Sequence, residues 1–154
     1  MKQILFLFSF IFILTTVGCG SSVLKTEIVV GKVTFNGVPL IQANVKFFPV
    51  SSGEEAQPSY AITDDAGEYR LQTLYGAPNA GTTPGDYVVT ITKAEMVSTG
   101  RKMRDSEGVI SEERKPKLVI PKNYTEIEKT PFKVTVVAHK KNIFDFELKD
   151  NESK

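Results

Sequence analysis

The sequence predicts an all-β fold, an antiparallel β-sandwich of about seven strands, for residues 28–149. Three observations lead to this fold class. Apolar side chains recur at every second position in several segments, as they do in half-buried strands. Turn-forming residues separate those segments at short intervals. No stretch after the N-terminal apolar run shows the period of an amphipathic helix. Two sheets packed face to face would bury the apolar faces of such strands.

The alternation is clear in six segments and weaker in two others. Within each clear segment, Val, Phe, Tyr, Ile or Leu alternates with polar or charged residues. The clear segments are Val29–Phe35, Ala43–Phe47, Glu68–Thr73, Tyr87–Thr92, Phe132–Val136 and Phe144–Leu148. The weaker strands are expected at Ser59–Thr63 and Lys117–Ile120.

The residues between these segments favour turns. Asn36-Gly37 is a tight-turn pair, because both residues tolerate positive φ. Asp64-Asp65-Ala66-Gly67 is typical of a hairpin loop with glycine in the left-handed position. Thr83-Pro84-Gly85 precedes the longest strand. These turn signals favour antiparallel pairing of the strands that they connect.

Residues 94–116 break the alternating pattern. They are polar and highly charged, with Arg101, Lys102 and Arg104 followed by the run Glu112–Lys115. Because such a segment has little apolar surface to bury, we expect a long mobile loop here. Residues 150–154 are expected to form a disordered tail.

The N-terminus has the order of a secretory leader. Lys2 precedes an apolar run from Ile4 to Leu14, and small residues close it. A membrane-spanning helix needs about 20 apolar residues, which this run does not provide. The prediction is a signal peptide over residues 1–18, and the alternative is an uncleaved membrane anchor.

Gly18-Cys19 directly follows this run, and the end of the leader resembles the lipobox of bacterial lipoproteins. The resemblance implies cleavage between Gly18 and Cys19 and attachment of two or three acyl chains, such as palmitate, at Cys19. Thr16 departs from the family pattern, which usually has leucine there. Cys19 is the only cysteine, so no internal disulfide forms. The alternative is a free cysteine beside an ordinary cleavage site.

Residues 19–27 form the predicted lipidated tether. The eight residues from Gly20 to Glu27 reach about 26–29 Å when extended, which keeps the domain near a membrane. In such lipoproteins an Asp after the cysteine signals inner-membrane retention in some bacteria, so Gly20 favours the outer membrane. The chain has 19 basic and 18 acidic side chains. This balance gives no electrostatic basis for nucleic-acid binding.

Three segments together resemble carboxypeptidase regulatory-like domains, which have a transthyretin-like (prealbumin-like) sandwich. They are Gly31–Leu40 followed by Ala43–Phe47, then Thr63–Tyr69, then Thr83–Ile91. Ile120–Tyr124 resembles an element of small bacterial lipoproteins with this domain. The resemblance implies a non-catalytic folding, spacing or binding module.

Side chains with catalytic or metal-binding chemistry are few. His139, the only histidine, is expected in an exposed turn beside two lysines rather than in a catalytic triad. Asp64, Asp65 and Glu68 are weak candidates for a calcium site, since calcium needs six or more oxygens. The alternative is a turn in which an Asp side chain accepts backbone amides. No cofactor is predicted.

Three functional hypotheses follow. The first is a non-catalytic, lipid-anchored envelope protein whose domain holds or recognises another envelope component. The second is a carbohydrate-binding module, with Tyr60, Tyr75 and Tyr87 as candidate stacking residues. Phe48 and Val88 are apolar at outward positions, which would indicate a binding surface only if they cluster. An enzyme is the third hypothesis.

Overall fold

The structure is a computed structural model that describes residues 25–51, 57–74, 76–104 and 106–150. The predicted leader, Gly18, Cys19, most of the tether and all of the tail except Asp150 lie outside these ranges. Within them the fold is all-β, with no α-helix and one short 3₁₀ helix, η1 (Lys122–Thr125). No helix in the described ranges has the length and apolar character needed to cross a membrane.

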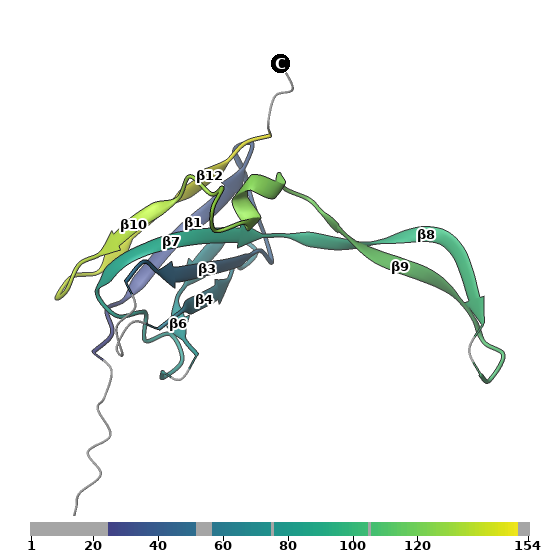
Figure 1. The fold of residues 1–154 in the computed structure, drawn as a ribbon, viewed down its shortest axis with the longest axis horizontal. Coiled ribbons are helices and arrows are strands. Elements are labelled where there is room, and N and C mark those ends of the chain that lie inside the picture. Colours follow the sequence, from purple (N-terminus) through teal and green to yellow (C-terminus); the bar gives the residue numbers. More distant parts are fainter. Residues whose placement is uncertain (1–24, 52–56, 75, 105, 151–154) are drawn as a thin grey trace, which may run out of the picture.

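Most strands belong to two five-stranded sheets that pack against each other (Figure 1). The first, here the β1 sheet, contains β1 (Val29–Phe35), β2 (Val38–Pro39), β5 (Glu68–Arg70), β11 (Asn142–Ile143) and β12 (Phe146–Leu148). The second, here the β3 sheet, has the order β10 (Lys133–Val136), β7 (Gly85–Thr92), β3 (Asn44–Pro49), β4 (Ser59–Ile62), β6 (Gln72–Thr73).

Pairing within the β3 sheet is antiparallel throughout, as the sequence predicts. In the β1 sheet, however, β1 runs parallel to both C-terminal strands, with Val29 opposite Asn142 and Val33 opposite Phe146. The prediction of a wholly antiparallel fold is therefore wrong at β1. Turn signals reveal neighbours joined by hairpins, whereas this pairing joins segments more than 100 residues apart.

The core lies between the two sheets, and Phe47 of β3 is at its centre. Its ring contacts Tyr69, Phe144 and Phe146 across the interface, with centroid distances of 6.5, 6.2 and 6.2 Å. The inward side chains are those that the alternation predicts. Fully buried ones include Val29, Val33, Val45, Phe47, Leu71, Tyr87, Val89, Ile91 and Leu148.

A group of hydroxyls closes one end of the core. The Tyr87 hydroxyl donates to the backbone carbonyl of Thr83, four residues earlier, at 2.8 Å. Ser59 donates to the Thr82 hydroxyl, which lies 3.1 Å from the Tyr87 oxygen. A tyrosine that bonds the backbone just upstream is a feature of immunoglobulin-type β-sandwiches. Here it fixes the turn that leads into β7.

Residues 94–118 correct the prediction of a loop over 94–116. They form two strands, β8 (Ala94–Arg104) and β9 (Ile110–Leu118), in an antiparallel hairpin that projects from the sandwich (Figure 1). We call this hairpin the arm. Every described residue of its strands is exposed except Glu113, which is half-buried. Of the weaker predictions, β4 confirms Ser59–Thr63, whereas the strand expected at Lys117–Ile120 overlaps only the end of β9.

Candidate functional site

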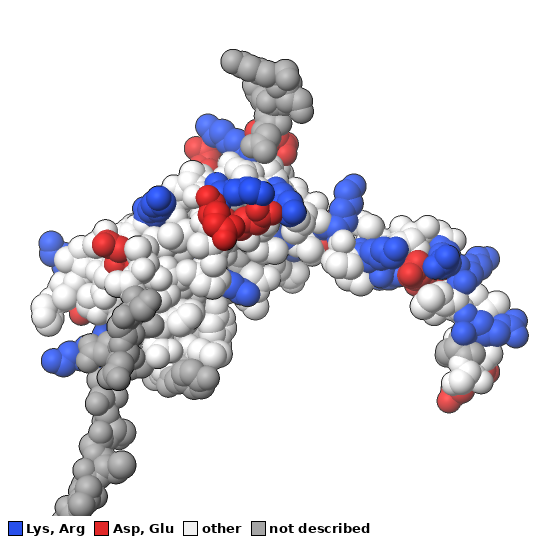
Figure 2. Space-filling model, in the orientation of Figure 1, with Lys and Arg blue, Asp and Glu red and all other residues white. Residues whose placement is uncertain are grey.

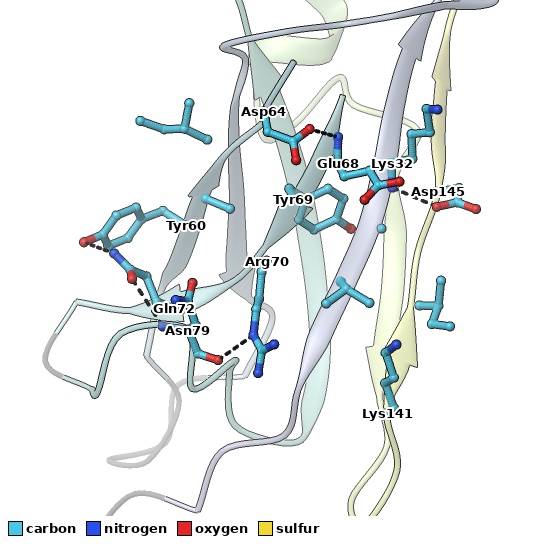
Figure 3. Close-up of a pocket in the computed structure, with 15 residues that line it drawn as sticks. Lys32, Tyr60, Asp64, Glu68, Tyr69, Arg70, Gln72, Asn79, Lys141 and Asp145 are labelled. Carbon is cyan, nitrogen blue, oxygen red and sulfur yellow. Dashed lines mark hydrogen bonds between the residues drawn. The ribbon is translucent and has the colours of Figure 1, made fainter. Parts of the chain in front are cut away.

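An open groove of about 800 Å³ runs along one edge of the sandwich. Its walls come from both sheets: Tyr60–Ile62 of β4 on one side, and residues of β1, β5 and β11 on the other. Figure 3 shows the charged and amide side chains around it. The exposed side chains of Ile62 and Ile143 add apolar surface to the rim.

A chain of hydrogen bonds orders the polar wall of this groove. The Gln72 side-chain NH₂ donates to the Tyr60 hydroxyl at 2.9 Å, and the Gln72 side-chain oxygen accepts from the Asn79 backbone N–H at 3.4 Å. Arg70 Nε donates to the Asn79 carbonyl at 3.0 Å (Figure 3). These contacts hold an aromatic ring, an amide and a guanidinium in fixed positions, each with hydrogen-bonding capacity left for a ligand.

Asp64 lines the groove from the turn between β4 and β5 and has a structural role. Its Oδ1 accepts the backbone amides of Ala66 and Glu68 at 2.9 and 2.8 Å. Gly67 has a φ of +74°, the left-handed conformation that the hairpin motif predicts. The predicted turn is thus confirmed. Among the residues that the structure describes, no three His, Cys, Asp or Glu side chains are grouped to hold a metal, Asp64, Asp65 and Glu68 included.

Tyr69 and Asp145 line the groove, and each side chain makes a hydrogen bond to the backbone. The Tyr69 hydroxyl donates to the Phe144 carbonyl at 2.7 Å, and Asp145 accepts the Lys32 backbone amide at 2.8 Å. Burial, reinforced by the negative charge of Asp145, raises the pKa of the Tyr69 phenol well above its ordinary value. The phenol therefore stays protonated near neutral pH and acts as a hydrogen-bond donor within the fold.

The tyrosines proposed for sugar stacking are not equivalent. Tyr60 is half-buried and lines the groove. Tyr87 is 1% exposed and has its hydroxyl inside the core, so its proposed role as a stacking residue is wrong. Tyr75 lies outside the described residues. The sequence does not show that Arg70, Gln72 and Asn79 lie near Tyr60. No local motif links them, because β4 and β6 become neighbours only through sheet pairing.

The remaining candidates lie elsewhere. His139 occupies an exposed turn with a φ of +60°, as predicted, and its backbone amide donates to Glu27. Phe48 and Val88 are direct cross-strand neighbours between β3 and β7, and both are half-buried. They form a small apolar pair on the sheet surface rather than a pocket.

Comparisons with known proteins add little. No family model matches the chain, and no curated protein matches it. A search of solved structures finds similarity to a 9R-lipoxygenase from Cyanothece PCC8801, with 12% sequence identity and a TM-score of 0.36. The match covers 84% of this chain and 18% of the lipoxygenase chain. A similarity this low supports no statement about fold or activity.

Proposed function

We propose that this chain is a non-catalytic, lipid-anchored protein of the cell envelope. Its domain, of the carboxypeptidase regulatory-like type, acts as a structural or protein-interaction module. One observation carries the proposal: the fold begins almost directly after the predicted anchor. Glu27 exchanges backbone hydrogen bonds with Thr82 at 2.7 and 3.0 Å, and its carboxylate accepts the His139 amide. An anchor at Cys19 therefore holds the sandwich within about 26–29 Å of the lipid.

Mass spectrometry of the protein purified from native membranes tests the anchor. The expected N-terminal peptide begins at Cys19 and carries acyl chains, and the Cys19→Ser variant lacks them. A peptide that begins at Met1, or a mature chain with a free Cys19 thiol, would contradict the proposal. Membrane fractionation of the same cells tests the expected outer-membrane location.

The groove is the surface that we propose for a partner of this envelope module. Ile62 and Ile143 are 63% and 60% exposed on its rim, where a partner would cover them. A photo-reactive residue at either position is expected to cross-link to one defined species in intact cells. Val38, 65% exposed on β2 and outside the groove, is the matched control. Equal cross-linking from all three positions would argue against a specific surface.

The carbohydrate-binding alternative has one observation in its favour. Tyr60 presents a fixed ring beside the Gln72 amide, and sugar-binding surfaces combine an apolar ring with polar groups that fix orientation. Glycan-array binding that is lost on Tyr60→Ala would favour this alternative, with Tyr75→Ala as a second variant. A blank array would count against it. Turnover in a hydrolase panel that a single substitution abolishes would refute the non-catalytic proposal altogether.

A further inference from the structure

The arm is a two-stranded hairpin that no other part of the described structure covers. At its base the Val119 amide donates to the Lys93 carbonyl at 2.9 Å. Two-stranded hairpins are marginally stable in water unless another surface packs against them. The arm nevertheless exposes large apolar side chains along its length, namely Met96, Val97, Met103, Val109, Ile110 and Leu118.

Six basic side chains accompany these apolar residues. They are Arg101, Lys102, Arg104, Arg114, Lys115 and Lys117. None of the six forms a salt bridge with another residue that the structure describes. Figure 2 shows basic side chains along much of the arm, with few acidic ones between them. The arm therefore presents cations whose charge is not balanced by direct ion pairs with described carboxylates.

Strand register divides the arm into two different faces. Residues opposite each other in the ladder share a face, so Lys102 and Arg104 lie with Ile110 and Arg114. Met96 and Leu118 continue this face towards the sandwich, and Glu112 is its one acidic residue within the two strands. On the opposite face Lys115 and Lys117 are balanced by Glu113 and Glu95. Both faces therefore carry apolar side chains, since Val97 and Met103 lie on the second face, and Arg101 lies in the irregular stretch between Ser98 and Lys102. The first face has three cations against one carboxylate, whereas the paired charges of the second face balance.

We propose that this basic, apolar face of the arm rests on an anionic membrane surface. Cations near anionic headgroups each strengthen binding roughly fivefold, and interleaved apolar side chains enter the interfacial region. The arm is long enough, since an eleven-residue strand extends about 36 Å, comparable to the reach of the tether. Its outer end also curves towards the side of the molecule where β1 begins (Figure 1). The placement of lipid beside the arm rests on the proposed anchor.

A single tryptophan can report contact between the arm and lipid, because the chain contains none. The test protein is the chain from residue 19 with Cys19→Ser, which retains every described element and has no acyl group. Ile110→Trp places the reporter on the basic face, and Val38→Trp places it on the sandwich as a control. With phosphatidylglycerol vesicles we expect a blue shift of the Ile110→Trp emission alone. Phosphatidylcholine vesicles, or about 0.5 M salt, should abolish it.

Two double charge-reversal variants distinguish binding through this face from binding through the net charge of the arm. Lys102→Glu with Arg114→Glu should weaken vesicle binding at least about 25-fold, since each cation contributes roughly fivefold. Lys115→Glu with Lys117→Glu makes the same change of charge on the opposite face and should weaken binding much less. Circular dichroism and melting temperature verify that each variant is folded.

Three results would overturn the inference: no emission change with anionic vesicles, equal shifts from both reporters, or equal losses from both double variants. Cross-linking of the arm to an acidic protein, without a lipid-dependent shift, would assign the face to that partner instead. The vesicle assay uses a chain that cannot be acylated. A failure of the anchor, seen by mass spectrometry, is therefore distinguishable from a failure of the arm.

Discussion

At Gly31 the parallel pairing of β1 with the C-terminal segment leaves no room for a side chain. A Cβ there would lie 1.8 Å from the Phe144 carbonyl oxygen and 2.9 Å from the Tyr69 ring. We expect Gly31→Ala to lower the free energy of unfolding by about 3 kcal/mol, because the Phe144 backbone and the buried Tyr69 ring must both move. Equilibrium denaturation measures the change.

Gly37→Ala is the matched control for that substitution. Gly37 has a φ of +79°, but no atom lies within 4 Å of its added Cβ. The expected loss is only about 1–2 kcal/mol, from the left-handed backbone conformation. If the two variants lost the same stability, the close approach at Gly31 would not be the cause.

The raised pKa of Tyr69 gives the fold a dependence on alkaline pH. An unfolded tyrosine ionises near pH 10, whereas the buried phenol keeps its proton to higher pH. Its contribution is therefore complete below about pH 10 and is lost as the pH rises above that value, by up to about 1.4 kcal/mol per pH unit. Denaturant melts at pH 9 and pH 11 should show a smaller loss for Tyr69→Phe than for the parent chain. If both chains lost the same free energy of unfolding between pH 9 and pH 11, the Tyr69 phenol would not be the cause.

At this scale the sequence predicts which side chains point inward better than it predicts their roles. The alternation correctly places Phe47, Tyr69 and Tyr87 in the core. The sugar-stacking role given to Tyr87 contradicted that alternation, and its hydroxyl turns out to bond the turn before β7. Gly31 could not be anticipated, because its crowding comes from Phe144, 113 positions later.

Among the elements, the arm is where sequence interpretation was least successful. A strand is recognised by one apolar face, and a hairpin exposed on both faces has no such period. Its charged composition therefore resembles that of a loop. The groove was equally hidden, since its walls come from β1, β4, β5 and β11, which no local motif links. By contrast, alternation and turn signals predict the strands of the β3 sheet.

The arm should be dispensable for the stability of the sandwich. Because Val119 donates to the Lys93 carbonyl, an Asn-Gly turn can replace residues 94–118 and keep that hydrogen bond. We expect the free energy of unfolding of the shortened chain to stay within about 0.5 kcal/mol of the parent, since the arm buries almost nothing. Thermal and denaturant unfolding measure this. A loss of several kcal/mol would mean that the arm packs on the sandwich.

For the whole molecule, the C-terminal strands complete the core. Phe146 and Leu148 are buried, and fully burying such side chains contributes about 1.5–3 kcal/mol each. A chain that ends at Lys141 also loses the parallel partners of β1. We expect it to lack cooperative unfolding and to be digested rapidly by protease. A chain that ends at Asp150 is the control and should behave as the parent; a stable, protease-resistant 1–141 chain would refute the prediction.

The pairing of Val29 with Asn142 also affects the order in which the strands can pair during folding. β1 can pair with β2 and β5 early, but it finds its two parallel neighbours only when β11 and β12 have been made. Closing so long a loop comes late in folding, because its entropy must be overcome before the contact is gained. The β1 sheet of such a polypeptide stays incomplete until β11 and β12 have been made. A precursor that is threaded through a membrane would likewise have to remain unfolded until its last strand is available.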